Sequence, residues 1–221
     1  MVIHQALFAG YGGVDATDWT IVSTDSGNGW NFRLSDGDYQ AGDLILFIGM
    51  SDSDNINFSN YYSNSFSTTE LVNTDDNSID YAINFGKMPS GVGYIQGNQG
   101  ADIGMALALR PSVTASSYSV TIKSLQEDND FPTHNNASVS LAAGSLAILI
   151  GMLDDDAISN ISPPSDSTFI AMDKDNGNGT MGVAYKKIAT SGSYSWGSWS
   201  TTEDEDDKAL AFVLEIIANE S

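Results

Sequence analysis

The chain of 221 residues contains no cysteine, which excludes disulfide bonds, thiol catalysis and zinc–thiolate sites. Positive charge is scarce, because 8 Lys and Arg stand against 29 Asp and Glu, and the formal net charge is -21. The acidity belongs to both halves, since the first 111 residues hold 13 acids and 3 bases and the rest hold 16 acids and 5 bases. Such a surface repels nucleic-acid phosphate and anionic lipid, so neither nucleic acid nor membrane is expected as a partner.

Other signals are also missing. No apolar run approaches the ~18 residues of a membrane helix, and the start MVIHQALFAGYGG lacks the basic and long apolar regions of a signal peptide. We therefore expect synthesis in a cytoplasm.

Histidine is limited to His4 and His134, and neither lies in a nucleophile-elbow pattern, so a Ser-His-Asp hydrolase is not expected.

Short strand-like segments dominate the chain. Asp outnumbers Glu by 23 to 6, and Gly, Ser and Asn are abundant, a composition typical of many turns. No stretch shows a long helical periodicity. The spacing predicts an all-β sandwich or barrel. The expected strands are Trp19–Ser23, Leu44–Met50, Ile79–Phe85, Ile103–Leu109, Tyr118–Ile122, Ala137–Leu141, Leu146–Met152, Thr168–Met172, Met181–Ile188, Tyr194–Trp199 and Leu210–Ile217.

One motif occurs twice. Residues 41–54 read AGDLILFIGMSDSD and residues 143–156 read AGSLAILIGMLDDD, with eight identical positions and a conservative Leu46/Ile148 exchange. The offset of 102 residues is too long for a solenoid repeat and suits a whole domain. The pattern predicts two copies of one fold.

The repeat extends in both directions. Thr20-Ile21 answers Thr121-Ile122, and the Ala-Leu-Ala of 106–108 answers that of 209–211. A short Pro- and Ser-containing linker lies near 110–117. We predict two tandem jelly-roll-type β-sandwich domains related by internal duplication, 1–111 and 112–221.

The second copy contains four short motifs: Gly144-Ser145-Leu146, Pro163-Pro164-Ser165, Tyr185-Lys186-Lys187-Ile188-Ala189 and Tyr194-Ser195-Trp196. Together they resemble a β-sandwich module common in virion proteins of tailed bacteriophages. The similarity covers roughly residues 120–217; the first copy keeps only Gly42-Asp43-Leu44. The resemblance implies a packing module and carries no catalytic residues.

Two groups of aspartates are candidate calcium ligands, because hard cations take several oxygen ligands at short spacing. Asp173 and Asp175 begin a loop-like stretch, but the later ligand positions of a calcium loop are lost, and a Gly-rich hairpin is the favoured interpretation. Asp154 and Asp156 follow the repeated apolar strand, where a solvated loop is favoured. No other cofactor is expected.

The Asn-, Ser- and Tyr-rich stretch 54–69 has the composition of a recognition loop. Its candidate partner- or glycan-binding residues are Asn57, Tyr61, Tyr62 and Phe66, and an ordinary polar loop is the alternative. In a strand, Trp196 and Trp199 would lie on opposite faces, so one of them at most is expected in the core. The acidic run 203–207 could place two carboxylates as in a glycosidase, but a solvated loop is favoured.

These observations lead to an expectation of a non-enzymatic structural protein of a phage particle, either a capsid decoration or a tail or appendage component. Its location would be the virion, and its partners would be capsid or tail proteins of the same particle. Homo-oligomerisation is also expected. The alternative is a carbohydrate-binding or host-adhesion module assisted by calcium.

Overall fold

The computed structural model describes residues 17–28, 32–35, 37–51, 56, 66–74, 79–91, 94–96, 101–128, 138–154, 160–175, 179–201 and 208–220. Every regular element within these ranges is a β-strand, so the all-β prediction is confirmed. No helix long and apolar enough to cross a membrane is found in them.

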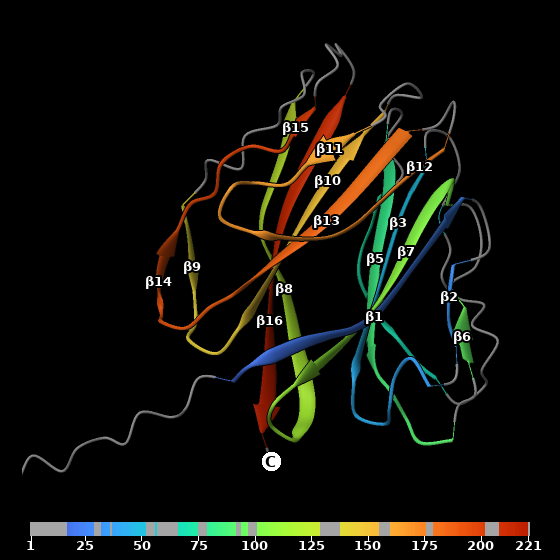
Figure 1. The fold of residues 1–221 in the computed structure, drawn as a ribbon, viewed down its shortest axis with the longest axis vertical. Helices are drawn as coiled ribbons and strands as arrows, with labels where there is room; N and C mark the ends of the chain where they lie inside the picture. Colours follow the sequence, from blue (N-terminus) through green and yellow to red (C-terminus); the bar gives the residue numbers. More distant parts are fainter. Residues whose placement is uncertain are drawn as a thin grey trace, which may run out of the picture.

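The first half of the chain forms a five-stranded antiparallel sheet in the order β1-β7-β3-β5-β4 (Figure 1). A two-stranded sheet of β2 and β6 accompanies it. The strands are β1 (Trp19–Asn28), β2 (Arg33–Ser35), β3 (Leu44–Ser51), β4 (Thr69–Thr74), β5 (Asp80–Lys87), β6 (Tyr94–Gln96) and β7 (Ile103–Pro111).

The second half forms another five-stranded antiparallel sheet, in the order β12-β13-β10-β16-β8. Two small sheets, β9 with β14 and β11 with β15, accompany it. The strands are β8 (Ala115–Asp128), β9 (Val139–Leu141), β10 (Leu146–Leu153), β11 (Ile161–Ser162), β12 (Thr168–Asp175), β13 (Gly179–Lys187), β14 (Gly192–Tyr194), β15 (Ser200–Thr201) and β16 (Ala209–Glu220).

The two large sheets have the same strand order. In each sheet the repeated apolar strand, β3 or β10, lies at the centre, and the first long strand, β1 or β8, lies at one edge. The turns before the central strands also match. The N–H of Gly42 donates to the carbonyl of Met88 at 2.8 Å, and the N–H of Gly144 donates to the carbonyl of Ile188 at 2.7 Å. Both glycines have positive φ, 97° and 79°, which other residues rarely adopt.

The large sheets face each other across one hydrophobic cluster to which both halves contribute. Tyr81 of β5 meets Phe212 of β16 there, with ring centroids 5.0 Å apart in an edge-to-face arrangement. All eight residues of β3 and of β10 are buried, which explains why these strands are continuously apolar. The chain crosses between the sheets after Pro111, beside the expected boundary. The division into sandwich domains 1–111 and 112–221 stays a prediction from the sequence, and the shared cluster sets against it the alternative of one cooperative unit.

A smaller apolar cluster covers the outer face of each large sheet. In each case a glycine in the sheet leaves room for an aromatic ring. A Cβ on Gly104 would lie 1.8 Å from the ring of Phe32, and a Cβ on Gly151 would lie 2.7 Å from the indole of Trp199. Both faces of each large sheet are therefore packed.

The predicted strand Tyr194–Trp199 is wrong beyond its first residue, because β14 ends at Tyr194. The chain from 195 to 199 is irregular, so the two-residue alternation of a strand does not apply. Trp196 and Trp199 are consequently both buried, at 3% and 0% exposure, in the outer cluster of the second half.

The predicted match between residues 106–108 and 209–211 is also wrong, by four residues. Leu44 pairs with Leu109, whereas the equivalent Leu146 pairs with Ile216. Leu107 therefore corresponds to Leu214 rather than to Leu210. An even shift keeps the same side chains on the inner face, which is why the sequence pattern did not expose the error.

Candidate functional site

A cleft of about 710 Å³ opens at the end of the molecule where the chain passes from the first sheet to the second. It lies beside the repeated turn of the first half, and its far wall is the connection between β7 and β8. The lining residues that carry polar or charged side chains are Gln40, Asp43, Lys87, Ser90, Arg110, Ser112, Thr114 and Tyr118.

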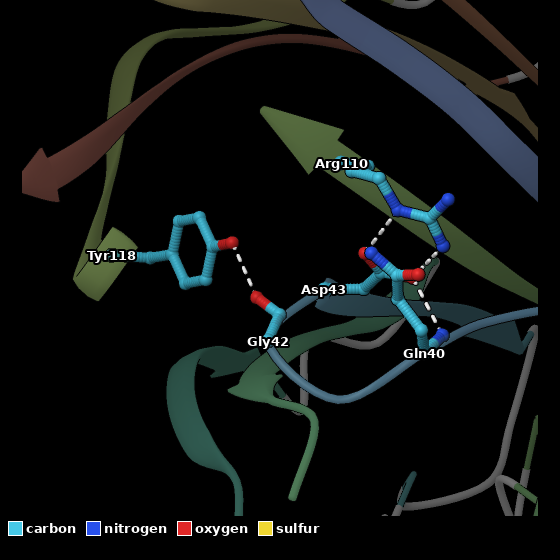
Figure 2. Close-up of polar contacts among 5 residues, drawn as sticks. All are labelled: Gln40, Gly42, Asp43, Arg110 and Tyr118. Carbon is cyan, nitrogen blue, oxygen red and sulfur yellow. Dashed lines mark hydrogen bonds and ion pairs between the residues drawn. The ribbon is translucent and has the colours of Figure 1, made fainter. Parts of the chain in front are cut away.

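Asp43 and Arg110 form the central ion pair of this cleft (Figure 2). The Nε of Arg110 donates to Oδ1 of Asp43 and its Nη2 donates to Oδ2, both at 2.7 Å. The backbone N–H of Gln40 adds a third bond to Oδ2 at 2.8 Å. Asp43 is 1% exposed, whereas the side chain of Arg110 is 35% exposed. The buried carboxylate therefore holds the more exposed guanidinium in place. The hydrogen bonds to Asp43 raise the pKa of Arg110 above its ordinary value.

Tyr118 approaches the same turn from β8, the first strand of the second half (Figure 2). Its hydroxyl donates to the carbonyl of Gly42 at 2.6 Å. Burial, and next the negative charge of Asp43, raise the pKa of Tyr118 to about 12. The phenol is therefore a neutral hydrogen-bond donor at physiological pH.

Lys87 joins the halves on another side of the cleft. Its Nζ donates to the carbonyl of Ala115 at 2.6 Å and to that of Ser116 at 3.1 Å, both at the start of β8. The ammonium group thereby holds the far wall against β5 of the first sheet.

These contacts have counterparts made in the opposite direction. Trp19 of β1 donates its indole N–H to the carbonyl of Gly144 at 2.8 Å, and Lys187 forms an ion pair with Asp18 at 2.7 Å. Trp19 and Tyr118 hold equivalent places in the two sheets. Trp19 pairs with Pro111, two residues after the partner of Leu44 at the start of β3. Tyr118 pairs with Ala218, two residues after the partner of Leu146 at the start of β10. Each half thus sends an aromatic donor to the glycine turn of the other.

The turn at Gly144 is covered, whereas the turn at Gly42 borders the cleft. A Cβ on Gly144 would lie 2.9 Å from the backbone nitrogen of Thr17, so the chain leading into β1 covers that turn. A Cβ on Gly42 would meet nothing within 4 Å. The second half uses a different ion pair at this turn: Glu215 accepts from the N–H of Ala142 at 2.7 Å and pairs with Lys123 at 3.1 Å. Ser145 replaces Asp43 in the repeat, and Ile217 takes the register position of Arg110.

Three of the four predicted calcium ligands are described, and they lie on strands β10 and β12 or directly after them, away from the Gly144 turn. Asp173 and Asp175 are in β12, which pairs with β13 as the hairpin interpretation predicts. Asp154 follows β10, and its N–H donates to the carbonyl of Lys208. Asp156 lies outside the described residues. Within those residues no group of three or more His, Cys, Asp or Glu side chains could hold a metal ion. Calcium binding stays a prediction.

Of the predicted recognition residues, the structure describes only Phe66. It is 6% exposed and meets Phe47 edge-to-face at 6.2 Å, so its side chain belongs to the outer apolar cluster of the first half. Asn57, Tyr61 and Tyr62 lie outside the described residues, as do His4, His134 and the acidic run 203–207.

Sequence reasoning did not select the cleft residues. Two signals were present: the repeat differs at Asp43 and Ser145, and Arg110 is a lone cation that ends an apolar strand. The pairing of residues 67 positions apart could not be read from spacing alone.

No family model, curated protein or solved structure matches the chain.

Proposed function

We propose that this chain is a non-enzymatic structural protein of a phage particle and acts through protein–protein interfaces. A capsid decoration or a tail or appendage component is the assignment that fits the similarity of residues 120–217 to phage virion modules. The expected partners are capsid or tail proteins of the same particle and further copies of the chain.

The places of the resembling motifs support this proposal. Gly144-Ser145-Leu146 forms the turn into β10, and Tyr185 to Lys187 end β13. Pro164 is buried, and Trp196 belongs to the apolar cluster on the outer face of the second sheet. The described residues of these motifs thus lie in a turn, at a strand end and in the apolar cluster, which is consistent with the proposed packing role.

The carrying observation is that the acid–base groups of the cleft are committed to structural contacts. Asp43 accepts three hydrogen bonds, Lys87 holds two carbonyls of β8, and Tyr118 donates to Gly42 as a neutral phenol. A general base needs a lone pair that is free to accept a proton and a pKa near the working pH. A general acid needs a proton that it can release near neutral pH. The cleft fits a role in architecture or binding better than one in proton transfer.

Mass spectrometry of phage particles purified from the host that carries this gene tests the proposal. We expect the chain in intact, density-purified particles at a fixed copy number: hundreds of copies would mark a shell decoration and a handful a tail component. Failure to find it in particles, with the major capsid protein detected in the same sample, would contradict the assignment.

A further inference from the structure

Arg110 has hydrogen-bonding capacity that the fold does not use. Its Nε and Nη2 hold Asp43, but Nη1 makes no hydrogen bond to any residue that the structure describes. Figure 2 shows this third nitrogen turned away from Asp43. Guanidinium groups bind carboxylates through two parallel N–H bonds, and the Nη1/Nη2 edge remains available for that geometry.

The anchoring of Arg110 favours binding. A free arginine loses much rotamer freedom when it grips a ligand. Here the buried carboxylate of Asp43, itself held by Gln40, already fixes the guanidinium in place. An incoming anion would therefore meet a group that is preorganised.

The charge around the cleft points to the same ligand class. Among the described lining residues, Lys87 and Arg110 are the cations and Asp43 is the acid, so this part of the lining is net positive in a chain with a net charge of -21. Asp43 directs its oxygens at Arg110 and Gln40 and leaves the remaining edge of the guanidinium open. The cleft volume lies within the ~300–1,000 Å³ typical of small-ligand sites.

The departure from symmetry is an independent sign. The equivalent turn of the second half is closed by Thr17, and it has neither the aspartate nor the arginine. A packing role shared by both halves would not require open space at one turn only, or an arginine that lines that space.

We infer that the cleft beside Arg110 binds a carboxylate group, held by the Nη1/Nη2 edge of Arg110 with Lys87 as a second positive charge. The carboxylate belongs either to a free small acid or to the end of a polypeptide chain. This site does not depend on the particle assignment, because it rests on the geometry of the cleft.

The arginine content allows a direct test. Arg33 and Arg110 are the two arginines of the chain, so the side-chain Nε–H region of a nitrogen-15 spectrum holds one probe and one internal control. The full chain would be titrated at low ionic strength with glutarate, with acetyl-Ala-Ala, with the amide of that dipeptide and with inorganic phosphate. Loss of one signal in Arg110→Lys assigns the probe.

We expect glutarate or acetyl-Ala-Ala to shift the Arg110 signal saturably, with Arg33 unmoved and the dipeptide amide without effect. The acid that binds more tightly identifies the source of the carboxylate. Lys87→Gln should weaken binding several-fold. Lys187→Gln, at the equivalent position of the second half, should leave it unchanged; thermal unfolding of each variant verifies that it is folded.

Three results would overturn the inference. One is the lack of a saturable shift up to about 20 mM acid, which is well above the 1 mM range of weak specific binding. Another is an equal shift of Arg33, which would indicate general screening of charge. The third is tighter binding of phosphate than of either carboxylate.

Discussion

Trp19 and Tyr118 lie at equivalent positions of the two sheets, and their rings meet with centroids 6.2 Å apart at the junction of the halves. Each donates a hydrogen bond to a glycine carbonyl of the opposite half, Trp19 to Gly144 and Tyr118 to Gly42. Such exchanged contacts are typical of a two-fold interface, in which the same patch appears on both partners. The halves of this chain therefore pack as the subunits of a symmetric dimer do.

The first prediction concerns these two donors. Trp19→Phe should lower the free energy of unfolding by about 1–3 kcal/mol, because the buried carbonyl of Gly144 loses its donor. Tyr118→Phe should cost less, about 1 kcal/mol, because Tyr118 is only partly buried and water can reach Gly42. Urea unfolding measures both. An equal or larger effect of Tyr118→Phe would contradict the assigned burial.

A second prediction separates the buried ion pair from a surface pair. Arg110→Met should destabilise the protein by about 2–4 kcal/mol, because it leaves the carboxylate of Asp43 inside the protein without a cation. Lys186→Met removes a longer pair, 3.7 Å, whose carboxylate, Asp166, is 67% exposed, and should cost less than about 1 kcal/mol. Denaturant unfolding at pH 7 is the measurement. Comparable losses in the two variants would show that the Asp43–Arg110 pair contributes no more than a surface contact.

Tyr118 should give the protein a specific response to alkali. Its pKa is raised from 10.0 to about 12 in the folded state, so folding favours the neutral phenol. That contribution is complete below the unfolded pKa and is lost as the pH rises through the folded pKa. Between pH 10 and 12 the wild type should therefore lose more stability than Tyr118→Phe. Parallel loss in both proteins would mean that the phenol has no raised pKa.

A fourth prediction tests the fit of the outer layers. A methyl group on Gly104 would collide with the ring of Phe32, so Gly104→Ala should cost about 1–3 kcal/mol or more. Gly192→Ala is the control, since its Cβ would meet only Tyr194 at 3.8 Å. Phe32→Leu should recover part of the loss in the double variant, because the two positions share one space. Simple additivity of the two substitutions would count against this packing.

The comparison of sequence and structure is instructive at particular residues. Strands β3 and β10 were predictable, because burial on both faces requires a continuous apolar run. The turns before them were predictable from Gly42 and Gly144, because positive φ favours glycine. Trp196 and Trp199 were misplaced because nothing in their spacing shows that β14 ends at Tyr194. The ion pair between Asp43 and Arg110 depends on the register in which β3 pairs with β7, and the sequence pattern does not fix that register.

Differential scanning calorimetry of the full chain tests the central claim, that two equivalent sheets share one core and act as one cooperative unit. We predict a single transition with equal calorimetric and van't Hoff enthalpies, on the order of 150 kcal/mol for a chain of this length. Two resolved transitions, each with about half of that enthalpy, would contradict the shared core and would instead fit two independent domains.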